Sequence, residues 1–521
     1  MFLLGYDVGS SSIKATLMEA ETGKVITSAS SPETEMQILA TRPGWAEQHP
    51  QVWWENLVRA TSKMRSMSET DIRNVEAIGI AYQMHGLVVV DKNQQVLRPS
   101  IIWCDSRAVD IGKQAFLDIG EKRCLERLLN SPGNFTASKL KWVMQNEPEI
   151  YERIHKAMLP GDYIAMVMTG EIQTTPSGLS EGIIWDFQKQ ELAQFLLDHY
   201  GISKNVIPTV VLTFSAQGEL TKKVAEELGL RPGTKIAYRA GDQPNNALSL
   251  NVLNPGDIAA TAGTSGVVYG VGDKVNHDPK SRVNTFVHVN HAQEHPRYGV
   301  LLCVNGTGIL NSWLRHNLMG FGEHEASYEK MNELALQAPV GSEGLVILPY
   351  GNGAERSLED NDIGATFHGL EFNIHDRTHV LRAAQEGIAF ALNYGVEIMR
   401  GMGIDVKTIR AGNANMFLSH LFGDAFATIA KAQVELFHTD GSQGAARGAG
   451  IGAGIYRNQK DAFVGLEISR VIEPDKESAP GYQEAYERWL GVLKGELNRS
   501  HSTVPKHRRL YDSQTKRNRK P

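Results

Sequence analysis

Two short turns of similar composition, far apart in the sequence, contain residue types that bind phosphate. Residues 7–12 read Asp-Val-Gly-Ser-Ser-Ser, and residues 262–266 read Ala-Gly-Thr-Ser-Gly. Glycine lets the backbone turn tightly, successive N–H groups in such a turn can form an anion-binding concavity, and the hydroxyls add donors. Each turn alone could equally be an ordinary β-hairpin turn. Together they could hold a polyphosphate from two sides, with Asp7 holding a hydrated Mg²⁺ beside it.

A third candidate, Asp242, follows Gly241 and an apolar segment that we expect to be a strand. A carboxylate at the end of a strand that faces a cleft could accept a proton from a substrate hydroxyl. The alternative is that Asp242 caps a helix that starts near Pro244. Both can hold, because a helix N-terminus also lowers the pKa of a carboxylate and keeps it ionised.

Three further patterns argue against a metal site, a dinucleotide-binding loop and a P-loop. His85 lies between two expected strands, and without HExxH-like spacing it is more typical of a structural residue than of a metal ligand or base. Residues 444–454 are rich in glycine but fit no GxGxxG register, so we interpret them as a closely packed helix. The chain has no GxxxxGK[ST] motif, which disfavours a P-loop NTPase.

The composition is that of a multi-domain globular protein. The chain has 521 residues, 41% hydrophobic and 21% charged, with a formal net charge of −6. A mild acidic excess disfavours general nucleic-acid binding, and we find no uncharged apolar run long enough to span a membrane. The three cysteines are widely spaced, so a disulfide framework is not expected. Residues 1–10 lack a basic region, so we expect no secretory signal and a cytoplasmic protein.

The elements that must position the candidate groups follow from apolar periodicity. Strands are expected on both sides of each turn, which makes two strand–turn–strand units and suggests an internal duplication. The long helices of the second half are expected from apolar residues at steps of three and four. The expected strands are residues 2–6, 13–18, 77–82, 87–91, 235–240, 257–261, 267–271 and 434–438, and the expected helices are 51–65, 379–402 and 417–432.

Taken together and in order, the motifs resemble those of the FGGY carbohydrate kinases. They include Tyr6-Asp-Val-Gly, Gln83-Met-His-Gly, Gly241-Asp and Gly263-Thr-Ser-Gly. Within the family, the chain is most similar to members that phosphorylate xylulose, and the match ends near residue 490. The other matching segments are residues 44–48, 98–107, 135–142, 162–171, 348–350, 367–370 and 444–447.

The resemblance implies an α/β fold with two actin-like (ribonuclease-H-like) domains flanking a catalytic cleft. Residues 1–253 would form the N-terminal domain, which binds sugar and carries the catalytic base. Residues 254–490 would form the C-terminal, nucleotide-binding domain. Residues 491–521 would be a helix end and a basic tail that we expect to be disordered.

The same resemblance implies roles for individual residues. Asp242 would be the general base, and Asp7 would approach the γ-phosphate and Mg²⁺, through water. The ketose would contact Met84 and His85, with a further hydroxyl contact from Asp105. The nucleotide would be bound by the two turns and an adenosine loop, at Gly9, Ser10, Ser11, Ser12, Gly263, Thr264, Ser265, Gly412, Asn413 and Asn415.

The implied activity is transfer of phosphate from ATP, with Mg²⁺, to the terminal hydroxyl of a ketopentose, D-xylulose first. Another family substrate (ribulose, fuculose or glycerol) is the alternative, and a non-catalytic actin-like protein that binds sugar or nucleotide is a second. The partners would be small molecules, with neither nucleic acid nor membrane, and the enzyme could be a homodimer. Three segments depart from the family pattern: Ala411 before Gly412, residues 243–246, and residues 353–357, which appear one residue longer.

Overall fold

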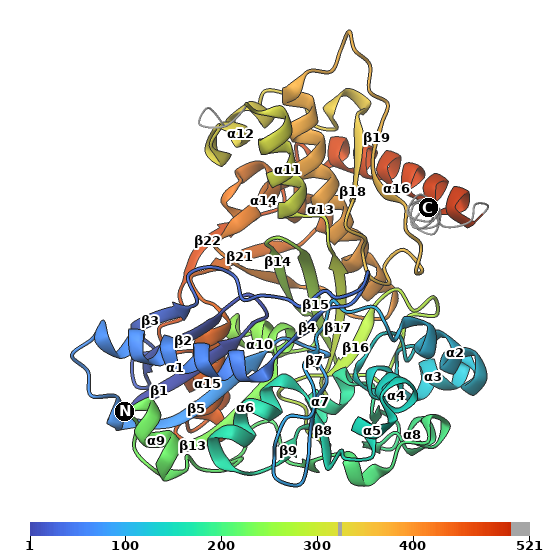
Figure 1. Cartoon of the computed structure of the whole chain (residues 1–521). Coiled ribbons are helices and arrows are strands. Elements are labelled where there is room, and N and C mark those ends of the chain that lie inside the picture. The colour runs from blue at the N-terminus through green and yellow to red at the C-terminus, as the bar shows by residue number, and fades with distance from the viewer. Residues whose placement is uncertain (321–325, 502–521) are drawn as a thin grey trace, which may run out of the picture.

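The computed structural model describes residues 1–320 and 326–501. The chain forms two domains, one above the other in Figure 1, and each is built on a mixed β-sheet. Within the described residues, no helix combines the length and the apolar character needed to cross a membrane. The basic tail expected from residue 503 onward lies outside the described residues.

The first sheet has the strand order β13-β5-β1-β2-β3. The first three strands in the sequence form an antiparallel meander, and the other two run parallel to β1. Helix α1 (Pro50–Ser66) packs against β2 and β3, as the apolar face of the expected helix requires. The strands are β1 (Phe2–Val8), β2 (Ile13–Glu19), β3 (Val25–Ser31), β5 (Val75–Tyr82) and β13 (Lys235–Gly241).

The second sheet has the order β16-β17-β15-β14-β20-β21-β22. Its central five strands repeat the pattern of the first sheet, because β14, β15 and β17 are antiparallel and β20 and β21 run parallel to β14. This repetition bears out the duplication and the two actin-like domains expected from the sequence. The strands are β14 (Asp257–Ala262), β15 (Gly266–Gly272), β16 (Asn284–Val287), β17 (Tyr298–Val304), β20 (Thr408–Gly412), β21 (Gln433–Phe437) and β22 (Ile468–Ile472).

Long helices cover the second sheet, and α13 is central among them. It starts two residues before the predicted position because the Asp376 carboxylate accepts hydrogen bonds from the N–H groups of Thr378 and His379. The helix predicted at 417–432 starts late, since Ser419 caps it. The helices are α11 (Gly308–Leu318), α12 (Tyr328–Ala335), α13 (Arg377–Gly401), α14 (His420–Ala430) and α16 (Ala479–His501), beside the strand pair β18 (Val346–Tyr350) and β19 (Gly364–His368).

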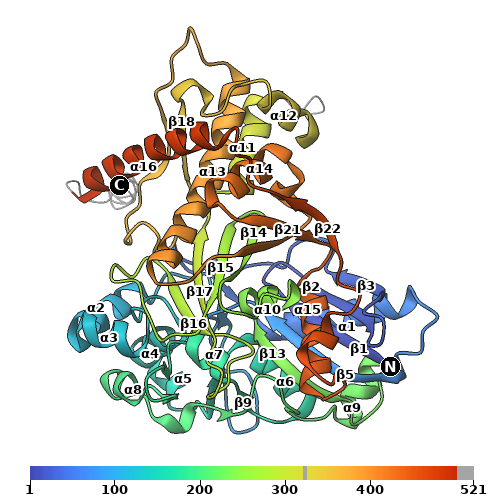
Figure 2. The same cartoon turned by 180° about the vertical axis from the view of Figure 1, so that it is seen from behind.

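Helix α15 (Gly441–Gly452) belongs to the second half of the sequence but packs on the first sheet, against β1, β5 and β13 (Figure 2). It is the closely packed helix predicted from its small residues. A Cβ at Gly5 or Gly79 would lie within 2 Å of a carbonyl oxygen of α15, so the strands need glycine there. A boundary at residue 253 in the sequence therefore does not fully separate the two domains in space. After β21 the chain returns to the first sheet, where α15 packs.

The remaining short elements lie mostly between β5 and β13 and surround the lower part of the molecule in Figure 1. They form four two-stranded pairs and a set of short helices in the first half of the chain. They are β4 (Glu47–Gln48), β6 (Val88–Val90), β7 (Ser100–Ile101), α2 (Val109–Ile119), α3 (Glu121–Arg127), α4 (Thr136–Asn146), α5 (Pro148–Tyr151), β8 (Lys156–Met158), α6 (Pro160–Thr169), β9 (Gln173–Thr174), α7 (Pro176–Glu181), β10 (Trp185–Asp186), β11 (Glu191–Leu192), α8 (Gln194–Tyr200), β12 (Thr209–Val210), α9 (Lys222–Leu228) and α10 (Asp242–Ser249).

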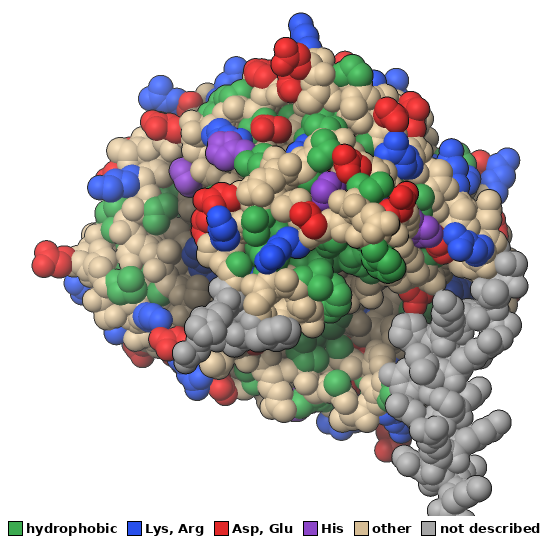
Figure 3. All heavy atoms as spheres, turned by 90° about the horizontal axis from the view of Figure 1, so that it is seen from above, with side chains coloured by type: hydrophobic (Ala, Val, Ile, Leu, Met, Phe, Trp, Pro, Cys, Tyr) green, Lys and Arg blue, Asp and Glu red, His purple; other side chains and the backbone are tan. Residues whose placement is uncertain are grey.

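The face of the second domain seen from above carries Lys and Arg side chains interspersed with Asp and Glu side chains (Figure 3). A large basic field, the usual footprint of a nucleic-acid-binding surface, is not visible on this face.

Candidate active site

A cavity of about 580 Å³ is lined by both halves of the chain. It brings His85, a predicted sugar contact, together with Thr264 and Ser265 of the second turn. The first half also contributes Trp103, Cys104, Val109, Lys113, Ser131, Gly133, Asn134 and Phe135, and the second half contributes Asn284, Asn305, Asn352, Glu355, Arg356 and Asp360.

Asp242 is partly buried at the junction of β13 and α10. Its pKa is raised to about 7, by burial first and by the nearby Asp7 charge second, while the Gln243 N–H opposes the rise. The expectation that Asp242 caps the helix was wrong, because Gly241 is the capping residue and Asp242 lies in the first turn. The expected lowering by the helix N-terminus is outweighed by desolvation. A pKa near neutrality suits a general base.

Asp7 lies next to this carboxylate at the end of β1. Burial raises the pKa of Asp7 to about 6, Asp440 adds to the rise, and Lys14 opposes it. Lys14 donates a hydrogen bond of 2.7 Å to Asp440, the N-cap of α15. A Cβ at Gly441 would lie 2.3 Å from Asp7 Oδ2, so the glycine leaves room for the carboxylate. The start of α15 therefore completes the surroundings of Asp7.

The described residues contain no group of three or more His, Cys, Asp or Glu side chains arranged to hold a metal ion. The predicted Mg²⁺ site can therefore not be a cage made only of these side chains. Two neighbouring, partly buried carboxylates with raised pKa values, Asp7 and Asp242, nevertheless fit a hydrated divalent cation, since Mg²⁺ commonly keeps several waters and takes one or two carboxylates.

The first turn is held by its neighbours rather than left open. The Gly9 N–H donates to the Ser12 carbonyl at 3.1 Å, and the carbonyls of Ser10 and Ser11 accept from Gln48 and Met36. The Ser10 hydroxyl accepts a hydrogen bond of 3.2 Å from the indole of Trp103, which lines the cavity. This hydrogen bond joins the turn that follows Asp7 to the wall of the cavity.

The second turn is fixed by the start of α11. The Gly263 carbonyl accepts hydrogen bonds of 2.8 Å from the Gly308 N–H and the Thr307 hydroxyl. A Cβ at Gly263 would lie 3.5 Å from the side-chain nitrogen of Asn415, so the predicted adenosine loop lies beside this turn. Asn415 has a left-handed backbone (φ 54°).

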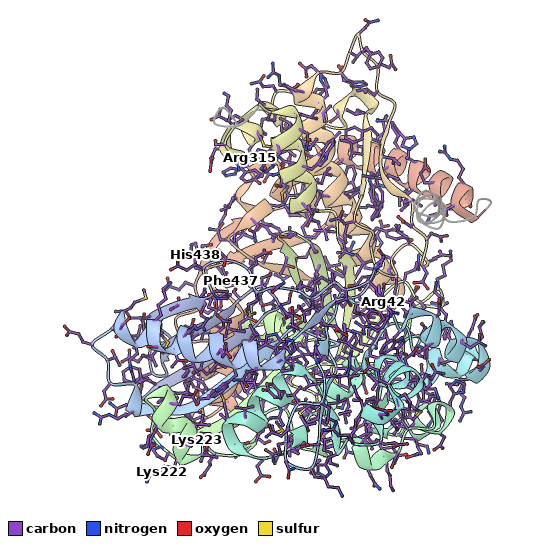
Figure 4. The ribbon with its side chains drawn as sticks, in the orientation of Figure 1. Arg42, Lys222, Lys223, Arg315, Phe437 and His438 are labelled. Atoms are coloured by element: carbon purple, nitrogen blue, oxygen red, sulfur yellow. The ribbon has the colours of Figure 1, made fainter. Side chains whose placement is uncertain are left out.

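The rest of the adenosine loop connects the ends of two parallel strands. Strand β20 ends at Gly412, and the Asn413 N–H donates to the Phe437 carbonyl at 2.8 Å. Phe437 and His438 mark the place where the chain leaves the second sheet toward α15 (Figure 4). The loop thus lies at the carboxyl edge of β20 and β21, where ligands commonly bind in α/β sheets.

His85 is held by a residue that the sequence did not single out, Glu181 at the end of α7. The backbone N–H of His85 donates to Glu181 Oε2 at 3.2 Å. The ring nitrogen Nδ1 of His85 lies 2.9 Å from the backbone carbonyl oxygen of Glu181. Because a carbonyl only accepts, Nδ1 carries the proton. Burial first, and Lys139 second, lower the pKa of His85 to about 3, so the ring is neutral and Nε2 is an acceptor.

Lys139 is a second residue without a predicted role, although it lies in a family-like segment. It is fully buried and its amine donates hydrogen bonds of 2.9 Å to the carbonyls of His85 and Ile102. It ties the His85 loop to the loop that precedes Cys104. The signal was a lysine in a helix whose neighbours are apolar, but its partners are 54 and 37 residues away.

The other two predicted sugar contacts lie in different surroundings. Met84 packs against the end of β13, where a Cβ at Gly241 would lie 2.6 Å from its Cγ. Asp105 is fully buried, and its carboxylate accepts hydrogen bonds from the Ala46 N–H at 2.6 Å and from Arg107 Nε at 2.9 Å. The structure brings Asp105 to Arg107 and not into the cavity lining, so its sugar contact has no geometric support here.

The paired sheets and the carboxylates between them define an actin-like phosphotransferase. Residues 2–249 match the N-terminal domain, and residues 258–453 the C-terminal domain, of the FGGY family of carbohydrate kinases. The chain belongs to this family and is a carbohydrate kinase.

Relatives named xylulose kinases match this chain over nearly its full length. The xylulose kinase of Bacillus subtilis is 29% identical over 505 residues, which cover 94% of this chain and 96% of the relative. That of Staphylococcus epidermidis is 30% identical over 499 residues, with the same coverage. The crystal structure of xylulose kinase from Rhodospirillum rubrum superposes with a TM-score of 0.86 at 25% identity, covering 96% of this chain and all of that one.

Proposed function

We propose that this carbohydrate kinase transfers the γ-phosphoryl group of ATP to the terminal hydroxyl of D-xylulose and forms D-xylulose 5-phosphate. The observation that carries the proposal is the cavity lined jointly by His85, Thr264 and Ser265, which combines a sugar contact with phosphate-binding donors. The choice of ketose is supported by relatives named xylulose kinases. Ribulose, fuculose and glycerol remain the alternative substrates.

In this reaction Asp242 accepts the proton of the terminal hydroxyl as the hydroxyl oxygen attacks the γ-phosphorus and ADP leaves. Burial first, and the nearby Asp7 charge second, raise the pKa of Asp242 and make it more basic than an ordinary aspartate. His85 Nε2 accepts a hydrogen bond from another hydroxyl and so fixes the sugar relative to the base. Phosphoryl transfer depends mainly on such positioning and on electrostatic stabilisation.

The nucleotide would lie on the second domain. Gly263, Thr264 and Ser265 supply backbone and hydroxyl donors to its phosphates, and the loop from Gly412 to Asn415 takes the adenosine. Asp7 would hold Mg²⁺ through water, and the ion, when bound, neutralises negative charge on the phosphates.

A coupled assay of ADP release tests this assignment with D-xylulose, D-ribulose, fuculose and glycerol as acceptors. We expect D-xylulose to give the highest kcat/KM and EDTA to abolish turnover. A tenfold preference for ribulose or glycerol would replace the substrate while keeping the family. ADP release with none of the acceptors, under conditions where nucleotide still binds, would favour the non-catalytic alternative.

A further inference from the structure

We infer that Glu355, on the second domain, is a specificity-determining residue that accepts hydrogen bonds from the hydroxyls of the sugar that His85 holds from the first domain. This inference rests on the proposed function only in taking a polyhydroxylated sugar as the ligand. The family resemblance assigned sugar contacts to the first domain alone. A contact from the second domain would make sugar recognition a property of the two domains together.

Glu355 lies in the loop that follows β18, and the loop is fixed at several points. The Asn305 N–H donates to the Gly353 carbonyl at 3.2 Å, and the Gly353 N–H donates to the Tyr350 carbonyl at 3.0 Å. At its root, a Cβ at Gly306 would lie 1.4 Å from the Pro349 carbonyl oxygen, so the two segments approach as closely as glycine allows. The loop is therefore a supported wall of the cavity.

The backbone of Glu355 itself is unusual. It has a left-handed conformation with φ 44°, which is uncommon for a residue with a side chain. Such strain persists where the surroundings over-determine it, and it occurs often at functional sites. Glu359 and Asp360 of the same loop share this conformation, and Glu355 lies in the lining of the cavity together with His85.

The part of the cavity wall around His85 and Glu355 presents several hydrogen-bond acceptors. His85 Nε2 is an acceptor because Nδ1 carries the proton. The side-chain oxygens of Asn134 and Asn284 are buried and have no hydrogen-bond partner among the described residues. The Glu355 carboxylate accepts a weak hydrogen bond, of 3.4 Å, from Asn284 Nδ2 and another from the Cys303 thiol. Acceptors in this number suit a ligand with several O–H donors, as in a sugar.

Two cations, Lys113 and Arg356, lie in the cavity lining. Arg356 donates to the hydroxyls of Ser131 and Ser281, and its guanidinium carbon lies 5.9 Å from the ring centroid of Phe135. The guanidinium is therefore already engaged with groups of the protein. The contact with Ser131 also ties the loop to the first domain.

Cys303, near the end of β17, interacts with both Glu355 and the proposed base. Burial is the main cause of the raised pKa of the Cys303 thiol, and the charges of both Glu355 and Asp242 add to it. Cys303 therefore lies within electrostatic reach of both carboxylates. Asp242 itself does not line the cavity, so a sugar held by His85 and Glu355 would have to present its terminal hydroxyl toward the base from the cavity.

The test compares Glu355→Gln with Glu359→Gln in the full-length enzyme. Glu359 is a matched control because it belongs to the same loop but does not line the cavity, and it forms an ion pair of 2.8 Å with Lys280. We expect Glu355→Gln to raise the KM for the preferred sugar roughly 10- to 100-fold, since a hydrogen bond to a charged group is lost. The KM for ATP should change less than twofold, and Glu359→Gln should resemble the wild type.

A second variant separates recognition from structure. Glu355→Asp keeps a carboxylate and should recover part of the sugar affinity that Glu355→Gln loses. A merely structural role would instead lower Tm and raise the KM for the sugar and for ATP together, and that result would overturn the inference. So would a sugar KM within twofold of wild type in Glu355→Gln.

The inference and the proposed function can fail separately. If the wild type prefers an acceptor other than D-xylulose, the proposed substrate is wrong, and the same variants are then measured with the preferred acceptor. A selective loss of affinity for that acceptor supports the role of Glu355. An unchanged affinity refutes the role whatever the substrate is.

Discussion

Replacing Asp242 by Asn should lower activity and raise stability at the same time. The variant keeps the size of the side chain but cannot accept the proton of the sugar hydroxyl. A positioned general base contributes about 10²- to 10⁴-fold, so we expect kcat to fall by that factor, while the KM for ATP stays near that of the wild type.

The effect on stability follows from the raised pKa of Asp242. The folded-state value is about 7 against an ordinary value of 3.8, mainly because burial disfavours the charge. For such a group, the contribution to stability is fully present below the ordinary pKa of 3.8 and is lost progressively as pH rises from there through about 7. The difference corresponds to roughly 4 kcal/mol above pH 8, as an upper bound. Asn carries no charge at any pH, so the variant avoids this loss.

The assays are ADP release for kcat and thermal unfolding at pH 5 and pH 8 for Tm. We expect the variant to have a higher Tm than the wild type at pH 8 and a smaller advantage at pH 5, where wild-type Asp242 is still protonated in the folded state but already ionised in the unfolded state. Asp405→Asn, at a carboxylate with 86% side-chain exposure, is the control and should change neither quantity. Near-wild-type turnover would refute the assignment as base, and a lower Tm at pH 8 would refute the electrostatic reasoning.

Three further predictions concern packing, the support of His85, and motion. Gly79→Ala should lower stability by about 1–3 kcal/mol in chemical denaturation, because its Cβ would lie 1.9 Å from the Ala445 carbonyl, whereas Gly401→Ala meets no atom and should not. Glu181→Gln should raise the sugar KM more than the ATP KM, because one of its two hydrogen bonds, to Tyr82 or to His85, loses its acceptor; equal changes in both would contradict a role through His85. Sugar and nucleotide together should compact the protein more than either alone in small-angle scattering, since the two domains contribute different parts of the site; an unchanged radius of gyration in all states would mean a cleft that is closed beforehand.

Local signals in the sequence account for most of the elements. Each strand–turn–strand unit combines an apolar run with glycine and hydroxyl residues, and both occur where the sequence predicts them, as β1–β2 and β14–β15. Strand β13 and the start of α10 also follow from composition within a few residues of Asp242. These features depend on backbone preferences and on the alternation of apolar side chains, which short stretches of sequence determine.

The contacts of the site could not be predicted from local signals, because they join distant parts of the chain. Glu181 holds His85 from 96 residues away, and Asp105 is engaged by Arg107 and Ala46 although its motif indicated a sugar contact. Periodicity shows that a side chain is buried, but it does not show which partner is buried with it.

The sequence by itself determined the two duplicated sheets, the family, and the carboxylates and turns that could carry out phosphoryl transfer. Only the tertiary structure decided that α15 crosses back to complete the surroundings of Asp7, that His85 Nε2 is the free acceptor, and that Glu355 faces the same cavity from the other domain. The physical reason is that secondary structure depends on nearby residues, whereas the ionisation and hydrogen bonding of a buried group depend on every segment packed around it.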